Sequence, residues 1–403
     1  MADATIHISP EQTRAEADGR FDRFRLIGWW DQRKLAQAKV LVIGAGALGN
    51  EIIKNLALLG VGNLFVADKD RVENSNLSRS ILYREADMGR AKAEVAVEAA
   101  RGIYPQINAH CFAGDVVHDL GMGVYRWADL VIGGLDNREA RLAINRNCWK
   151  VNRPWIDGAI EQIQGVARIF LPGGPCYECT MSQRDWQLLQ SRRSCNLLTR
   201  AQMQEGKTPT TPTISSIIAG VQCQEAVKLI HGMPTIGGRG WVFDGISTEA
   251  YQTEYQRKAD CYSHDTLDEI VSLDETCEAM TLRDLLRRAR EHVGDDAKLE
   301  LSREVLEKLV CHACGQEEVV FESLGRINAE RATCPHCGGG REPVLFDTIR
   351  GEERFLDRTP AQIGLPPLDI FIARGGGRSI GLELSGDAAR VLGPLVADGL
   401  EWV

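Results

Sequence analysis

The segment that most constrains the fold is a glycine-rich turn between an apolar strand pattern and an apolar helical pattern. Residues 40–43 are Val-Leu-Val-Ile, and a GxGxxG motif follows at Gly44, Gly46 and Gly49. The apolar residues after the turn recur at helical spacing. Glycines here let backbone N–H groups approach phosphate oxygens at a helix N-terminus, where unpaired donors and the helix dipole favour negative charge. The motif predicts a nucleotide-binding strand, turn and helix.

An acidic residue after the next strand pattern supports this interpretation. A second apolar run, residues 64–67, ends at Asp68. A carboxylate about twenty residues beyond the glycine turn is placed to accept hydrogen bonds from ribose hydroxyls. The combination favours a nucleotide site over a tight structural turn without a ligand.

Polar and charged residues beyond Asp68 distinguish two kinds of nucleotide chemistry. Hydride transfer from NAD leaves the pyrophosphate intact, so a glycine turn and one acid largely suffice. Cleavage of ATP between its α and β phosphates moves negative charge onto the leaving pyrophosphate, so cations and a metal must lie close to it. Any one of the charged residues alone would be interpreted as a solvated surface charge, but their joint spacing favours ATP. The candidates are Asp70, Asn76, Arg79, Lys92, Asp136 and Asn137.

An ordered set of motifs resembles the family of ThiF, MoeB and the ubiquitin-activating enzymes. The matching stretches cover roughly residues 20–264 and read VLVIGAGALG, ADKDRVENSNLSR, GRAK, GGLDN, PCYEC and AGVQCQEAVKLI. The resemblance implies that Asp68 binds the ribose and that Asp136 binds Mg²⁺. It also implies a set of residues that holds the triphosphate and the α-phosphate. That set is Asp70, Asn76, Arg79 and Lys92.

A short motif near the N-terminus adds an expectation about assembly. The stretch RFDR resembles the family's RYNR, whose last arginine reaches into the ATP site of the partner subunit. The resemblance therefore implies a homodimer in which Arg23 acts on the other chain. The alternative is that Arg23 is a surface arginine.

Composition narrows the class of protein. The chain has 403 residues and a formal net charge of −9, which argues against nonspecific nucleic-acid binding. No apolar run approaches the roughly twenty residues of a membrane span, and the polar start of the chain lacks the apolar core of a signal peptide. We therefore expect a cytoplasmic enzyme without a membrane partner. Twelve cysteines in such a chain point to metal sites and reactive thiols before disulfides.

Two groups of cysteines have the spacing of metal ligands. Paired CxxC motifs predict a structural zinc ribbon without an open coordination position, against the alternative of two unrelated reduced pairs. A second half-site, Cys176 and Cys179, needs two more ligands. In the family a second CxxC follows, whereas this chain offers Cys261 and His264, a Cys₃His zinc set unless His264 is simply an exposed histidine. The ribbon cysteines are Cys311, Cys314, Cys334 and Cys337.

One further cysteine has the surroundings of a nucleophile. Cys195 lies among Arg192, Arg193 and Arg200 in a polar segment, and nearby cations favour the reactive thiolate. By resemblance, activating enzymes that form thioesters carry their catalytic cysteine here, although the family often has threonine where this chain has Asn196. The alternative is a free loop thiol. Of the remaining cysteines, one lies in an acidic loop and the others are expected to pack: Cys277, Cys111, Cys148 and Cys223.

The strand and helix patterns predict an α/β protein. We expect a Rossmann-like, doubly wound, mostly parallel sheet, whose later strands admit an antiparallel arrangement, followed by a zinc-ribbon domain. The expected boundaries are an N-terminal helical arm at 1–36, an adenylation domain at 37–264 with a crossover loop at 180–211, a helical linker at 265–308, and the zinc ribbon with a tail at 309–403.

These residues together suggest a two-stage activation that uses ATP, Mg²⁺ and Zn²⁺. The C-terminal carboxylate of a ubiquitin-like β-grasp modifier would be adenylated with help from Arg79, Lys92 and the partner's Arg23. It would then pass to Cys195 as a thioester and on to a conjugating enzyme. Such a compact activator resembles those of bacterial ubiquitin-like conjugation systems, some of them in antiviral operons. Three alternatives stay open: a sulfur-carrier adenylyltransferase without a thioester relay, an NAD-dependent oxidoreductase, and a nonenzymatic zinc scaffold.

Overall fold

An eight-stranded sheet forms the centre of the first domain. The computed structural model describes residues 19–186, 209–323 and 329–396. The first five strands are parallel and in register, with Ile43 beside Ala67 on one side and Gly133 on the other. In spatial order the strands are β3 (Asn108–Phe112), β2 (Asn63–Ala67), β1 (Lys39–Ile43), β4 (Leu130–Gly134), β5 (Trp155–Glu161), β6 (Gln164–Phe170), β7 (Arg239–Asp244) and β8 (Glu249–Glu254).

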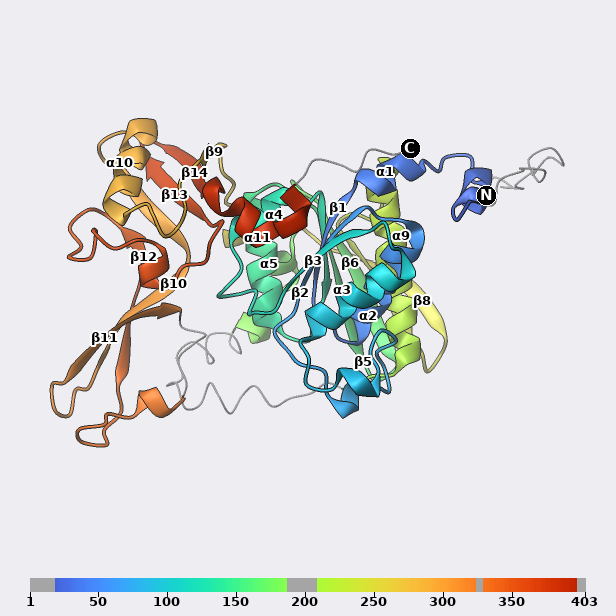
Figure 1. Cartoon of the computed structure of the whole chain (residues 1–403), viewed down its shortest axis with the longest axis horizontal. Helices are drawn as coiled ribbons and strands as arrows, with labels where there is room; N and C mark the ends of the chain where they lie inside the picture. Colours follow the sequence, from blue (N-terminus) through green and yellow to red (C-terminus); the bar gives the residue numbers. More distant parts are fainter. Residues whose placement is uncertain (1–18, 187–208, 324–328, 397–403) are drawn as a thin grey trace.

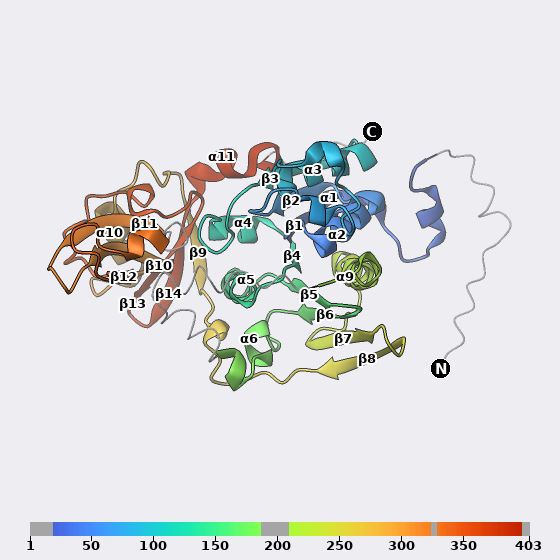
Figure 2. The same cartoon turned by 90° about the horizontal axis from the view of Figure 1, so that it is seen from below.

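Helices cover both faces of this sheet, as Figure 2 shows. One core packs under α1 (Gln32–Gln37), α2 (Ala47–Leu59), α3 (Lys92–Ile103) and α9 (Pro212–His231). The other packs under α4 (Met122–Trp127), α5 (Arg138–Lys150) and the short α6 (Tyr177–Thr180). The central strands are buried on both faces because their residues are continuously apolar, which is typical of parallel strands. The predicted doubly wound, mostly parallel sheet is confirmed, and β6, β7 and β8 are the antiparallel later strands.

A second sheet of six strands forms the C-terminal domain, drawn at the left of Figure 1. Helix α10 (Leu282–Val293) packs its apolar side on this sheet, as the spacing of Leu282, Leu285, Leu286 and Ala289 predicts. All strand pairs are antiparallel except β14 with β9. The strands are β9 (Glu269–Leu273), β10 (Lys298–Val310), β11 (Glu317–Ser323), β12 (Glu342–Ile349), β13 (Ile370–Gly375) and β14 (Arg378–Leu384).

The structure corrects the expectation of a helical linker at 265–308. This stretch supplies β9, α10 and most of β10 to the second sheet, so the boundary expected at 308 falls inside a strand. Strand β9 pairs in parallel with β14, which lies more than a hundred residues later in the chain. Pairing over that separation leaves no local sequence signal, so the sequence alone does not predict strand β9.

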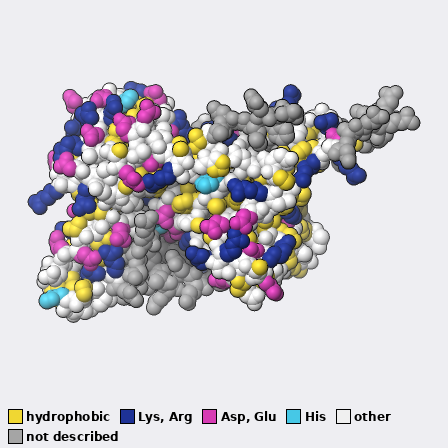
Figure 3. Space-filling model, viewed as in Figure 1, with side chains coloured by type: hydrophobic (Ala, Val, Ile, Leu, Met, Phe, Trp, Pro, Cys, Tyr) yellow, Lys and Arg dark blue, Asp and Glu magenta, His cyan; other side chains and the backbone are white. Residues whose placement is uncertain are grey.

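The two domains share a buried contact. The Asp369 carboxylate, 1% exposed, accepts hydrogen bonds from the Met122 N–H at 2.9 Å and from Arg303 at 3.3 Å. After β14 the chain returns through α11 (Ala388–Leu392), whose Leu392 joins the core on the α4 side of the first sheet. On the face drawn in Figure 3, positive and negative side chains are interspersed over both domains. Among the described residues, no helix combines the length and the apolar character that crossing a bilayer requires.

Candidate active site

The three glycines form a close turn at the carboxyl end of β1. Gly44 has a φ of +95°, and a methyl group added there would lie 2.4 Å from the carbonyl oxygen of Gly134. A methyl group at Gly49 would lie 1.8 Å from the carbonyl oxygen of Gly44, so only glycine lets helix and strand approach this closely. Gly46 begins α2 without a side-chain cap, and the space beside it is open. The helix N-terminus is therefore available to an anion.

Asp68 lies at the end of β2, beside this turn. Its carboxylate accepts the Ala45 N–H at 2.6 Å and the Asp70 N–H at 2.7 Å, so it supports the turn directly. Burial raises the pKa of the Asp68 carboxyl, and the Ala45 hydrogen bond and the charge of Lys92 oppose that rise only in part. A carboxylate has about four acceptor positions, so two remain for ribose hydroxyls.

Lys92 begins α3 and points to the same edge of the sheet. Its side chain is 9% exposed, and its ammonium pairs with the Asp70 carboxylate at 2.8 Å. The Lys92 N–H also donates to the Asp70 carbonyl at 2.9 Å. A lysine buried to this extent is seldom a solvated surface charge. The structure thus brings together Asp68, Asp70 and Lys92.

Asn76 and Arg79 lie in the segment that connects Asp70 to α3. The buried Asn76 side chain accepts the Glu73 N–H at 2.9 Å, so part of its role is to hold a short 3₁₀ turn. Arg79 is half-buried, and its guanidinium donates to the carbonyl of Ser75. The segment is fixed against the first turn of α2, because the Leu82 N–H donates to the Asn50 side chain at 2.9 Å.

Asp136 and Asn137 follow β4, the neighbour of β1 in the sheet. The Asn137 side chain accepts the Ala140 N–H at 2.8 Å and caps α5, which gives it a structural role that the motif alone did not predict. Asp136 is exposed at the same edge of the sheet as the glycine turn. The charge of its carboxylate helps to raise the pKa of the Lys69 ammonium, which lies just after β2.

Arg23 lies far from the glycine turn of its own chain. It is exposed on a 3₁₀ turn, Asp22–Leu26, next to Phe21. The Phe21 ring closes on Gly60, at the C-terminal end of α2. Because the 13 residues of α2 span about 20 Å, Arg23 is separated from the site by roughly the length of that helix.

Sequence reasoning missed the polar groups that hold the turn from behind. The Asn50 side chain, fully buried, donates to the Ala45 carbonyl at 2.7 Å, and the Tyr83 hydroxyl donates to the same carbonyl. Burial raises the pKa of Tyr83, so this hydroxyl stays a donor. The sequence offered one indication of this role, a polar Asn50 between the apolar residues Leu48 and Ile52 of a predicted helix.

A buried charge cluster supports the β4–α5 connection and was also missed. The Asp157 carboxylate is fully buried between the Arg141 Nε at 2.9 Å and the Arg168 Nε at 2.8 Å. Arg141 donates in addition to the carbonyls of Gly158, at 2.9 Å, and Leu135. Since Leu135 precedes Asp136, Arg141 fixes the backbone from which Asp136 projects.

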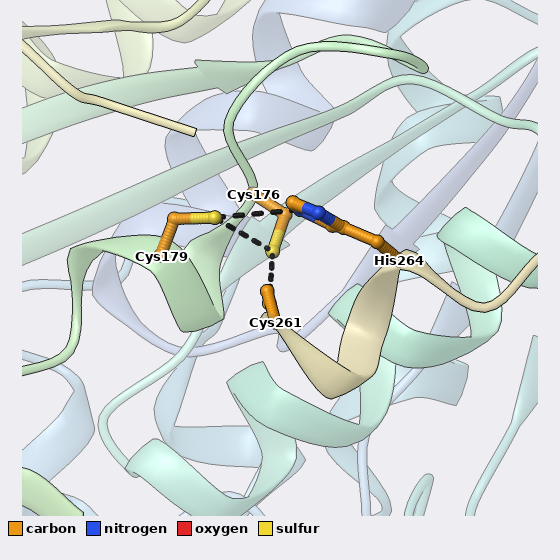
Figure 4. Close-up of side chains that lie close together, drawn as sticks. All are labelled: Cys176, Cys179, Cys261 and His264. Atoms are coloured by element: carbon orange, nitrogen blue, oxygen red, sulfur yellow. Dashed lines mark hydrogen bonds between the residues drawn. The ribbon is translucent and has the colours of Figure 1, made fainter. Parts of the chain in front are cut away.

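The predicted Cys₃His set comes together, as Figure 4 shows. The Cys176 sulfur lies 3.7 Å from that of Cys179 and 3.6 Å from that of Cys261, and the Cys179 sulfur lies 3.3 Å from the His264 Nε2. Sulfurs bound at about 2.3 Å to one tetrahedral ion would lie roughly 3.8 Å apart. The four side chains therefore have the separations that Zn²⁺ requires.

The four ribbon cysteines also converge, at the end of β10 and before β12. The sulfurs of Cys311 and Cys337 lie 3.5 Å apart, and those of Cys314 and Cys334 lie 3.7 Å apart. The two turns share one backbone pattern, in which the first cysteine's carbonyl accepts the N–H of a glycine at positive φ, 2.8 Å away in one turn and 2.9 Å in the other. This repeated geometry is typical of zinc knuckles, and four thiolates fit a structural ion.

The expected nucleophile Cys195 lies outside the described residues. The end of its segment is described: Thr211 caps α9 with Pro212 in the first turn, as the sequence predicts. The other cysteines are packed, since Cys148 and Cys223 are buried and Cys111 is half-buried. Burial, together with Asp387, raises the pKa of the Cys277 thiol to about 12, which opposes a nucleophilic role.

Comparisons with known proteins show what the chain is similar to. The model of the ThiF family matches residues 20–263. The chain is 29% identical to the SAMP-activating enzyme E1 of Haloferax volcanii over 63% of this chain and 90% of that enzyme. It is 38% identical to the Nedd8-activating enzyme E1 catalytic subunit of Drosophila melanogaster over 52% of this chain, and 31% identical to the adenylyltransferase and sulfurtransferase MOCS3-1 of Zea mays over 57%.

The extent of these matches differs. The chain spans only about half the length of the fly and maize proteins, 48% and 47% respectively. Among solved structures, E. coli MccB with ATP superposes with a TM-score of 0.53 at 21% identity, over 64% of this chain and 77% of that one, which shows a shared fold.

Proposed function

The chain belongs to the ThiF family of E1-type adenylyltransferases, and from that premise we propose that it uses ATP to activate the C-terminal carboxylate of a ubiquitin-like or sulfur-carrier protein. The observation that carries the proposal is the convergence of three features at one sheet edge. These are the uncapped helix N-terminus at Gly46, the ribose-binding candidate Asp68, and the buried ammonium of Lys92. An NAD-dependent oxidoreductase needs no such buried cation beside the phosphates.

Adenylation follows from the chemistry of these groups. A carboxylate oxygen of the modifier attacks the α-phosphorus of ATP, the bond from that phosphorus to the bridging oxygen breaks, and pyrophosphate leaves. Lys92 and Arg79 stabilise the negative charge that develops, and Arg23 of a second copy would add a third cation in a homodimer. Asp136 is the residue that would hold Mg²⁺, which when bound neutralises pyrophosphate charge.

A thioester step is the more specific part of the proposal. The Cys195 thiolate attacks the carbonyl carbon of the acyl-adenylate, the bond from that carbon to the phosphate oxygen breaks, and AMP leaves. The acyl group then passes to a cysteine of a conjugating enzyme. The cationic sequence around Cys195 and the likeness to SAMP-, SUMO- and Nedd8-activating enzymes support this relay. We assign to the zinc ribbon the docking of the conjugating enzyme or the modifier.

The alternative is a sulfur-carrier adenylyltransferase in which the acyl-adenylate is the main product. The likeness to MOCS3 proteins, whose names combine adenylyltransferase and sulfurtransferase, favours keeping it. The two differ only in whether a covalent adduct forms on Cys195.

A gel experiment separates the two functions. The protein is incubated with Mg·ATP and a panel of β-grasp proteins that end in a free diglycine, while pyrophosphate release is followed in parallel. We expect release with one panel member, together with a band on nonreducing gels that reductant removes. Cys195→Ala should abolish the band and keep pyrophosphate release, while the control Cys111→Ala should keep both. A band that persists in Cys195→Ala would contradict the relay, and absence of pyrophosphate release with every panel member would contradict activation.

A further inference from the structure

The order of the strands indicates where the base of the bound nucleotide lies. In the proposed function, the phosphates would lie against the glycine turn after β1, and the ribose would lie against Asp68 at the end of β2. The next strand in the same direction is β3, whose carboxyl end lies beside Asp68, because the Asp68 N–H donates to the Phe112 carbonyl at 3.1 Å. A nucleotide that continues along this edge places its base over the turn that follows β3.

That turn carries a fixed carboxylate. Asp115 Oδ1 accepts the Val117 N–H at 2.9 Å, and Asp115 Oδ2 pairs with the Lys69 ammonium at 3.1 Å. The Asp115 side chain is 28% exposed, so it is held in place and still open on one side. Burial alone would raise the pKa of the Asp115 carboxyl, but Lys69 and the Val117 N–H hold that pKa below its usual value, so the group is an acceptor at neutral pH.

The lysine that orients Asp115 belongs to the nucleotide edge itself. Lys69 directly follows Asp68, and its ammonium also experiences the charges of Asp70 and Asp136. It has three donors and uses one on Asp115. The carboxylate in turn has about four acceptor positions, of which two are used within the turn. Acceptor positions of Asp115 therefore remain for a ligand that lies over this turn.

Resting on the proposed function, we propose that Asp115 reads the base of the nucleotide, accepting a hydrogen bond from the exocyclic amine of adenine, and that Lys69 is its positioning residue. Adenine presents a donor where guanine and hypoxanthine present a carbonyl oxygen. A fixed carboxylate attracts that donor and repels a carbonyl oxygen in the same place. The pair thereby makes the site selective for ATP among purine nucleotides.

Purine riboside triphosphate, which is ATP without the exocyclic amine, tests the proposal. Affinities for it and for ATP are measured by calorimetry with Mg²⁺ and without any modifier protein. The wild type should prefer ATP by at least about tenfold, because a hydrogen bond to a charged group is lost with the amine. Asp115→Ala should bind the two nucleotides equally. The control Asp129→Ala, which removes a carboxylate that accepts the Lys39 N–H at the opposite edge of the sheet, should keep the preference.

Variants of Lys69 keep the test independent of how well Asp115→Ala folds. Lys69→Met should lower the preference for ATP about threefold or more, and Lys69→Arg should restore it, because the guanidinium also pairs with a carboxylate. Equal binding of both nucleotides by the wild type, or an unchanged preference in Asp115→Ala, would overturn the base-reading role while adenylation stands. A wild type that binds neither nucleotide would overturn the proposed function and this role with it.

Discussion

Removal of Arg141 tests how strongly the buried charge cluster stabilises the first domain. The Asp157 carboxylate is fully buried, and Arg141→Met would take away one of its two guanidinium partners. The variant would also leave the carbonyls of Gly158 and Leu135 without this donor. Breaking a buried ion pair on one side costs about 3–5 kcal/mol. For a domain of this size that corresponds to a fall in unfolding midpoint of roughly 6–20 °C.

Thermal unfolding followed by circular dichroism measures the effect. The control is Arg138→Met, on the same helix, whose guanidinium is half exposed and pairs with Asp185 at 3.2 Å. Such a pair contributes at most about 1 kcal/mol, so the control should unfold within a few degrees of the wild type. Calorimetry should also show weaker Mg·ATP binding in Arg141→Met, because the backbone before Asp136 is released. Equal midpoints for the two variants would refute the stabilising role of the cluster.

Three further predictions address the turn, the pH dependence and the metal. Gly49→Ala should weaken ATP binding about tenfold or more, because its Cβ would meet backbone at 1.8 Å, while Gly102→Ala, with nothing within 4 Å, should leave calorimetric binding unchanged. Burial raises the folded-state pKa of Asp68, so its contribution to stability is complete below the unfolded pKa and is lost as pH rises through the folded pKa. Asp68→Asn should therefore gain in unfolding midpoint relative to the wild type as the pH rises above about 4, the usual pKa of an aspartate, and a constant difference would contradict this sign. Cys314→Ser should lower the zinc content from about two ions to one by mass spectrometry of the metal, with ATP binding retained; loss of ATP binding would contradict a purely structural ribbon.

The sequence predicted those strands whose own residues are continuously apolar. The apolar runs that became β1, β2 and β4 are buried on both faces, so their sequences needed no partner to be recognised. Strand β9 has only two partly buried apolar residues before Leu273, and its stability comes from a partner far along the chain. One contact between distant residues, that of Cys176 with His264, was predictable because cysteine and histidine are the residue types that bind zinc. The hydrogen bonds of Asn50 and Tyr83 to the Ala45 carbonyl were not predictable in this way, because neither residue type indicates its partner before the chain is folded.

The Cys₃His cluster and the start of the second domain form one structural unit. Asp265 directly follows His264, and its carboxylate accepts hydrogen bonds from Lys150 of α5, at 2.8 Å, and from Arg374 of β13. Arg374 also pairs with Glu300 of β10. The residue after the last ligand thus joins a helix of the first domain to two strands of the second. Since β9 begins only four residues further on, the cluster fixes the point and direction at which the chain enters the second sheet. A change that loosens the four ligands should therefore alter the orientation of the C-terminal domain more than it alters the nucleotide site.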